Sequence, residues 1–159
     1  MIRIIYILGY GHSGSTLLDR ILGSNRYCLS LGEIRQWSKI LNQPHLFNKD
    51  SRLECSCGKK LRNCKFYGNL TESINKKYNI IGHFSNIYYF KIILRLFFKK
   101  KLAVINPPKD DYIKFLTNVS KKVNTIYIID SSKTLVNLIK LINANNVETK
   151  VIHLVRDIR

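Results

Sequence analysis

Residues 4–22 read IIYILGYGHSGSTLLDRIL, and this stretch decides the fold. Ile4 to Leu8 form a β-branched, aromatic and leucine run that is typical of a buried strand. A glycine-rich segment over residues 9–16 follows, and apolar side chains then fall on one helical face. Those side chains are Leu17, Leu18, Ile21 and Leu22. Gly23 and Asn25 are stop signals for that helix. Strand, loop and helix in this order predict an anion site, because loop N–H groups and a helix N-terminus both favour negative charge.

Residues 9–16 have the glycine spacing of a nucleotide-binding P-loop, G-x-x-x-x-G-K-[ST], but Ser15 stands where the lysine belongs. That lysine contacts the β- and γ-phosphates of a nucleoside triphosphate. A loop that keeps the glycines and Thr16 still suits a phosphate, but it is poorly built to cleave a triphosphate. The alternative is a glycine-rich turn that binds nothing.

Composition predicts a single globular domain over residues 1–159, with 45% hydrophobic residues and a formal net charge of +17. Such a charge favours anionic partners, although part of it can be solvated surface charge. The first strand begins so early that no secretory signal precedes it, which predicts a cytoplasmic protein. Residues 87–98 are apolar but too few to span a bilayer. With Lys99 to Lys101 they form either a basic helix at a membrane surface or a packed helix followed by solvated charges.

The remaining pattern alternates helices and strands, which predicts an α/β fold with a parallel sheet flanked by helices. The predicted segments are a helix over 33–42, a polar cysteine-bearing insert over 44–68, a helical region over 70–101, an amphipathic helix over 112–123, a strand over 125–129, a helix over 135–142 and a strand over 151–155. Ligands of such sheets bind at the carboxyl ends of the strands.

Polar residues follow each predicted strand. The second strand ends in Asp130-Ser131-Ser132-Lys133-Thr134 and the third in Arg156-Asp157-Ile158-Arg159. Lys133 and Arg156 should therefore line the same edge as the glycine loop, as a ligand with two separated phosphates would require. Taken singly, Lys133 could be a solvated lysine at a helix start, and Arg156 could pair with Asp157.

These three segments together resemble the P-loop sulfotransferases, which use 3′-phosphoadenosine 5′-phosphosulfate. The resemblance implies that the glycine loop holds the 5′-phosphosulfate and that Arg156 contacts the 3′-phosphate. By match, the loop residues are Gly11, His12, Ser13, Gly14, Ser15 and Thr16. Family members continue beyond the Arg-Asp-x-Arg run. The resemblance therefore implies the N-terminal part of the fold, with part of the 3′-phosphate and acceptor sites lying beyond residue 159.

The resemblance also assigns three catalytic candidates. His12 stands where the family has Lys or Arg, and a histidinium could serve as cation or proton donor if a bound anion raises its pKa. Leu31-Gly32-Glu33 resembles the Gly-Glu element of tyrosylprotein sulfotransferases, whose Glu takes the proton of the acceptor hydroxyl. Lys133 matches a lysine that stabilises the sulfuryl group. Glu33 could instead be an acid at a helix start that interacts with the helix dipole.

The cysteines form a separate group. Cys55, Cys57 and Cys64 with Cys28 or His45 could supply four zinc ligands, but Cys-x-Cys-Gly is shorter than the usual Cys-x-x-Cys. Thiols without a structural metal are the default interpretation.

The sequence therefore predicts transfer of a sulfuryl group to the hydroxyl of a sugar, a lipid or a protein tyrosine, with no catalytic metal. The alternatives are a P-loop nucleotide kinase or NTPase, a basic nucleic-acid-binding module, and an inactive truncated sulfotransferase. Nucleic acid is not the expected partner, because no aromatic–basic recognition motif is present. The oligomeric state is not indicated.

Overall fold

The structure is a computed structural model that describes residues 1–34, 59–60, 63–65, 91, 94, 98 and 111–156. Its elements are β1 (Ile2–Gly9), α1 (Ser15–Gly23), β2 (Cys28–Ser30), α5 (Tyr112–Lys122), β3 (Tyr127–Asp130), α6 (Leu135–Ile142) and β4 (Val147–Leu154). The predicted helix over 33–42, the helical region over 70–101 and most of the insert over 44–68 lie outside the described residues. Within the described ranges, no helix has the length and apolar character needed to cross a bilayer.

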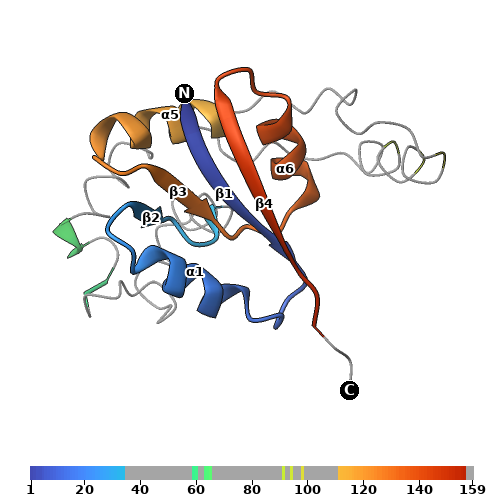
Figure 1. The fold of residues 1–159 in the computed structure, drawn as a ribbon, viewed down its shortest axis with the longest axis horizontal. Helices are drawn as coiled ribbons and strands as arrows, with labels where there is room; N and C mark the ends of the chain where they lie inside the picture. The colour runs from blue at the N-terminus through green and yellow to red at the C-terminus, as the bar shows by residue number, and fades with distance from the viewer. Residues whose placement is uncertain are drawn as a thin grey trace.

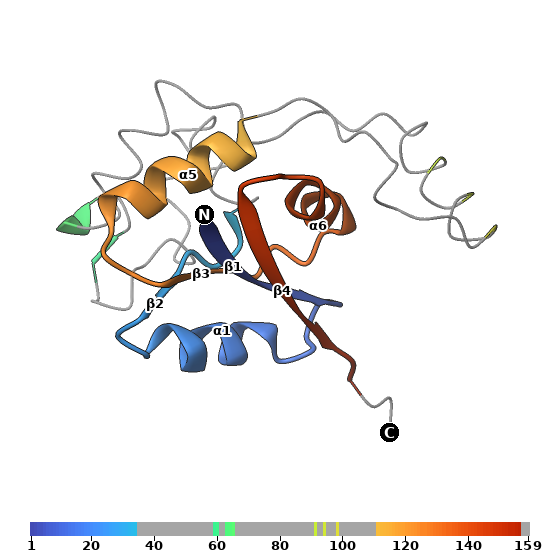
Figure 2. The same cartoon turned by 45° about the horizontal axis from the view of Figure 1, so that its top comes forward.

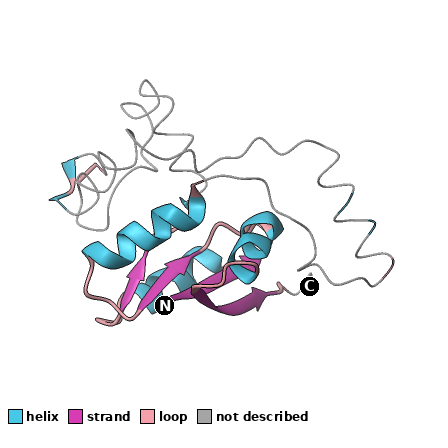
Figure 3. Cartoon of the chain, turned by 90° about the horizontal axis from the view of Figure 1, so that it is seen from above, coloured by secondary structure: helices cyan, strands magenta, loops and turns pink. Residues whose placement is uncertain are grey.

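The sheet has four parallel strands in the order β2-β3-β1-β4, with β1 in an interior position (Figure 1). In β1, Ile4 pairs with Ile128 of β3 on one side and with Thr149 of β4 on the other. Helix α1 covers one face of the sheet, and α5 and α6 cover the other (Figure 2). Figure 3 shows α5 and α6 together over the strands from above. The predicted α/β class, a parallel sheet flanked by helices, is confirmed.

The core lies between the sheet and the α5/α6 layer. Alternate residues of β1 point into it, and α5 contributes residues spaced three and four apart, as an amphipathic helix requires. Its central members are Ile2, Ile4, Tyr6, Tyr112, Phe115, Leu116, Val119, Ile128, Leu138 and Leu141. Burying one such side chain stabilises the fold by roughly 1.5–3 kcal/mol, so this layer holds the helices against the sheet.

The strands that differ most from the sequence prediction are β2 and β4, whereas the bounds of β1 and β3 shift by one or two residues. Strand β2 was missed, because three residues are too few to show an alternating pattern. Strand β4 begins at Val147 instead of residue 151. The added residues include Glu148 and Lys150, which a buried strand would exclude. They are tolerated because β4 stands at the edge of the described sheet, where polar side chains reach solvent.

The orientation of α1 also corrects the prediction of one apolar helical face. Leu17 and Ile21 point to solvent, with 65% and 58% of their surface exposed, whereas Ser15 and Asp19 are buried. Leu18 and Leu22 are half-buried, so the inward face is mixed. Asp19 is accommodated there because it accepts a hydrogen bond of 2.6 Å from the Ser30 hydroxyl of β2. Helix α1 is thus joined to β2 partly by a polar contact.

Gly23 has a steric role in this contact that differs from a stop signal. The residue after it, Ser24, is right-handed, so the end of α1 does not use a left-handed glycine. A Cβ added to Gly23 would lie 2.7 Å from the Ser30 Cβ. Only glycine therefore allows α1 and β2 to approach this closely.

We expect Gly23→Ala to lower the free energy of unfolding by about 1–3 kcal/mol, because the added methyl group forces α1 away from β2. Urea unfolding measures this change. Gly11→Ala is the matched control, since its added Cβ meets nothing within 4 Å. Equal stabilities of the two variants would contradict the steric role of Gly23.

Candidate functional site

The carboxyl ends of the strands gather the polar loops at one edge of the sheet. Strand β1 continues through α1 toward β2 on one side of the sheet, whereas its neighbour β3 continues through α6 toward β4 on the other side. Ligands of open α/β sheets bind at such a switch point, which here lies between β1 and β3. The loops there contain two non-glycine residues with positive φ, His12 at 63° and Lys133 at 61°. Left-handed backbone at a non-glycine residue is strained, and such strain clusters at functional sites.

The glycine loop after β1 presents backbone donors at the start of α1. The Ser13 N–H donates to the Tyr10 carbonyl at 3.3 Å, which closes a tight turn. Gly14, with φ 87°, precedes the helix. Within the described ranges no side chain caps the helix N-terminus, and the first turn of α1 carries no acidic residue. The Ser13 hydroxyl is buried without a hydrogen-bond partner in the described part of the chain. These donors suit a bound phosphate-like anion.

Two contacts hold this loop against β4. A Cβ on Gly9 would lie 3.0 Å from the Leu154 carbonyl oxygen, so the backbones approach too closely for a larger residue. The Arg156 guanidinium donates to the His12 carbonyl at 3.0 Å. Arg156 is exposed and keeps further N–H groups that can face a ligand. The structure therefore brings the predicted residues His12 and Arg156 together.

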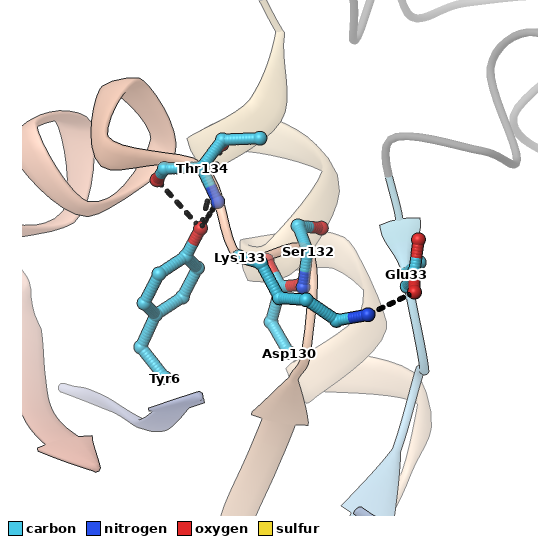
Figure 4. Close-up of polar contacts among 6 residues, drawn as sticks. All are labelled: Tyr6, Glu33, Asp130, Ser132, Lys133 and Thr134. Atoms are coloured by element: carbon cyan, nitrogen blue, oxygen red, sulfur yellow. Dashed lines mark hydrogen bonds and ion pairs between the residues drawn. The ribbon is translucent and has the colours of Figure 1, made fainter. Parts of the chain in front are cut away.

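The other two catalytic candidates form an ion pair. The Lys133 Nζ lies 2.6 Å from the Glu33 Oε1 (Figure 4). The two side chains are partly buried, with 17% of the Lys133 surface and 31% of the Glu33 surface exposed. Backbone pairing beyond the strand ends sets this proximity. The Leu31 N–H donates to the Ile129 carbonyl and the Ser131 N–H donates to the Gly32 carbonyl, both at 3.0 Å. The two loops therefore run side by side up to the ion pair.

Asp130 is buried directly before the turn that carries Lys133. Its Oδ1 accepts the Ser132 N–H at 2.8 Å, and its Oδ2 accepts from the Tyr112 hydroxyl of α5. Burial raises the pKa of Asp130 to about 6, and the hydrogen bonds from Ser132 and Tyr112 only partly offset that rise. Asp130 thus acts as a structural acceptor that shapes the turn.

Asp19 is a second buried carboxyl at this edge. Burial raises its pKa, the hydroxyls of Ser30 and Ser131 lower it, and the charge of Glu33 raises it. The carboxyl thus sits among side chains from α1, β2 and the loop after β3. Asp19 therefore links α1, which follows the glycine loop, to β2, which precedes Glu33.

The remaining site predictions have different outcomes. Ser15 is buried, with Gly11 and Thr16 exposed in the same loop region. Of the zinc candidates, Cys64 is buried, and Cys55 and Cys57 lie outside the described residues. The described residues hold no group of three potential metal ligands.

Sequence reasoning predicted no structural role for three buried residues that shape this edge, Tyr6, Asp19 and Asp130. A signal existed for Asp130, because an Asp followed by two serines after a strand favours a turn closed by the Asp side chain. Asp19 follows Ser15 by four residues, which places both on one helical face. Nothing in the sequence indicated the role of Tyr6, because tyrosine is common in strands.

Comparisons of the chain with protein-family models, with curated proteins and with solved structures find no match. The chemistry of this edge is therefore inferred from its own residues.

The raised pKa of Asp130 predicts a pH-dependent stability. Between the unfolded value near 3.8 and the folded value of about 6, the folded chain binds more protons than the unfolded chain. The contribution of Asp130 is then greatest below pH 4 and falls as the pH rises to about 6. We expect the free energy of unfolding of the wild type, minus that of Asp130→Asn, to fall by about 2–3 kcal/mol over this range.

Urea unfolding at half-unit steps from pH 4 to pH 7 measures this difference. Glu148→Gln is the control, because this carboxylate is exposed and pairs with Arg3 at 3.2 Å. The difference in free energy of unfolding between the wild type and Glu148→Gln should show no such fall. A wild-type minus Asp130→Asn difference that is flat or rises with pH would contradict the buried acid.

Proposed function

We propose that this chain transfers a sulfuryl group from 3′-phosphoadenosine 5′-phosphosulfate to an acceptor hydroxyl of a sugar, a lipid or a tyrosine. The observation that carries the proposal is the ion pair of Glu33 and Lys133 at the edge that also holds a lysine-free glycine loop. A base and a cation beside a phosphate-binding loop are the groups that sulfuryl transfer needs.

The fit of the donor rests on the glycine loop. The helix N-terminus and the buried Ser13 hydroxyl, neither of which has a side-chain partner among the described residues, suit the oxygens of the 5′-phosphosulfate. Arg156 is tied to the loop through the His12 carbonyl and keeps guanidinium donors for the 3′-phosphate. His12 belongs to this loop and has a strained backbone, and in the proposed complex an imidazole N–H would donate a hydrogen bond to the bridging oxygen.

In the proposed reaction, Glu33 removes the proton of the acceptor hydroxyl as that oxygen bonds to sulfur. The bond between sulfur and the bridging phosphate oxygen breaks, and adenosine 3′,5′-bisphosphate leaves with that electron pair. Lys133 stabilises the charge on the sulfuryl oxygens, and the loop N–H groups stabilise the charge on the leaving phosphate. Glu33 ends the step protonated.

The ion pair restricts the order in which donor and acceptor bind. While Lys133 contacts Glu33 at 2.6 Å, the carboxylate is occupied by its counter-ion. An ammonium on a four-carbon side chain can exchange this partner for the sulfuryl oxygens. Donor binding would then release Glu33 for the acceptor, so we expect the donor to bind first.

Triphosphate cleavage has less support. P-loop NTPases use the loop lysine on the phosphates, and hold Mg²⁺ with the loop Ser or Thr and an Asp. Here Ser15 replaces that lysine, and both carboxylate oxygens of Asp130 accept hydrogen bonds within the protein.

We expect adenosine 3′,5′-bisphosphate to raise the thermal unfolding midpoint, with little effect from AMP or Mg-ATP. At one hundred times its dissociation constant, a ligand stabilises the folded chain by about 2.7 kcal/mol. AMP should have little effect because it lacks the 3′-phosphate. Arg156→Ala should reduce the shift that the bisphosphate causes, because the variant lacks the guanidinium that contacts that phosphate. Stabilisation by Mg-ATP alone would instead support a nucleotide kinase.

We expect Glu33→Gln to lower kcat for transfer from radiolabelled donor to a panel of hydroxyl acceptors by about 10²–10⁴-fold. Donor affinity should stay the same or increase, because Lys133 loses the charge that competes with the donor. Glu148→Gln is the matched control, with an equal charge change at an exposed position. A Glu33→Gln chain with wild-type kcat would exclude Glu33 as the base.

A further inference from the structure

We propose that Tyr6 is a positioning residue that holds Lys133 in place, an inference that rests on the proposed function of Lys133. Tyr6 lies on β1, pairs with Asp130 of β3 and is fully buried. Its hydroxyl accepts the Thr134 N–H at 2.8 Å and donates to the Thr134 carbonyl at 2.7 Å (Figure 4). A single side-chain oxygen thus fixes both polar backbone groups of the residue after Lys133.

A buried tyrosine hydroxyl usually finds a hydrogen-bond partner, so the contact alone would not indicate a role. The position of the contact, next to Lys133, does indicate a role. Lys133 has a φ of 61°, which a residue with a Cβ adopts only when its surroundings enforce it. On one side Asp130 accepts the Ser132 N–H, and on the other Tyr6 binds Thr134. Lys133 is therefore the strained residue between two anchored neighbours.

Anchoring the backbone determines what the Lys133 side chain can do. Its Cα is held, so its ammonium moves only by rotation of the four-carbon side chain. Strand β1 carries Tyr6 and leads directly into the glycine loop. Tyr6 thereby ties the position of Lys133 to the same strand that positions the phosphate-binding loop. We infer that this link keeps the ammonium within reach of a sulfuryl group bound at the loop.

The inference separates two ligands that share every feature except the sulfuryl group. Tyr6→Phe removes the hydroxyl and keeps the buried ring. We expect its affinity for adenosine 3′,5′-bisphosphate to stay within about twofold of the wild type, because that ligand needs only the loop and Arg156. Its affinity for the sulfated donor should fall by about five- to tenfold, and kcat by at least as much. Isothermal titration without acceptor measures both affinities.

A double-mutant cycle with Lys133→Met makes the test specific. Lys133→Met alone should give the same selective loss of the sulfated donor. In the Lys133→Met background, Tyr6→Phe should cause no further loss, because the residue that it positions is gone. Tyr127→Phe is the matched control, since it removes a hydroxyl whose contact is Lys150 at 3.4 Å. That variant should bind both ligands as the wild type does.

Several outcomes would overturn the inference. Equal weakening of both ligands in Tyr6→Phe, or an additive cycle, would leave Tyr6 with a structural role only. A wild-type chain that folds but binds neither ligand would refute the proposed function itself, which is a distinguishable result. If Tyr6→Phe does not fold, Tyr112→Phe loosens the same turn through Asp130 and should show the same selective loss. Its failure to do so would count equally against the inference.

Discussion

The carboxylate of Asp130 is buried at the end of β3, and the shape of the candidate site depends on its hydrogen bonds. Through the Ser132 N–H it bends the chain into the turn that places Lys133. Through the Tyr112 hydroxyl it connects that turn to α5, the helix that forms much of the core. A buried carboxyl is costly unless such bonds are made. Because an unsatisfied buried carboxyl would be destabilising, the turn is restricted to the few conformations in which both carboxylate oxygens accept hydrogen bonds.

The fold class and several elements could be predicted because they rest on local patterns. Residues 112–122 and 135–142 carry strong helical periodicity, and both helices lie where the sequence placed them. The place of Arg156 beside the glycine loop, where it donates to the His12 carbonyl, agrees with the rule that parallel strands share a carboxyl edge. Features that depend on local patterns or on a rule of sheet topology could be predicted from the sequence alone.

The parts that escaped prediction depend on contacts between distant residues. The ion pair of Glu33 and Lys133 joins positions a hundred residues apart, and nothing near either residue specifies the other. The inward turn of Asp19 requires Ser30 as its partner, so the apolar pattern on α1 was wrong for Leu17 and Ile21, which are exposed. The role of the Tyr6 hydroxyl likewise needs the register of β1 against β3. Single-sequence patterns contain propensities but not these pairings.

The place of β1 between β3 and β4 has a consequence for how the chain is made. A ribosome adds about 5–20 residues per second, and β1 is synthesised long before the strands that flank it. For several seconds the nascent chain therefore carries an apolar strand with both edges unpaired. Such a segment is prone to aggregate and suits the binding grooves of chaperones. The strand that leads into the glycine loop is thus also a segment that needs protection during translation.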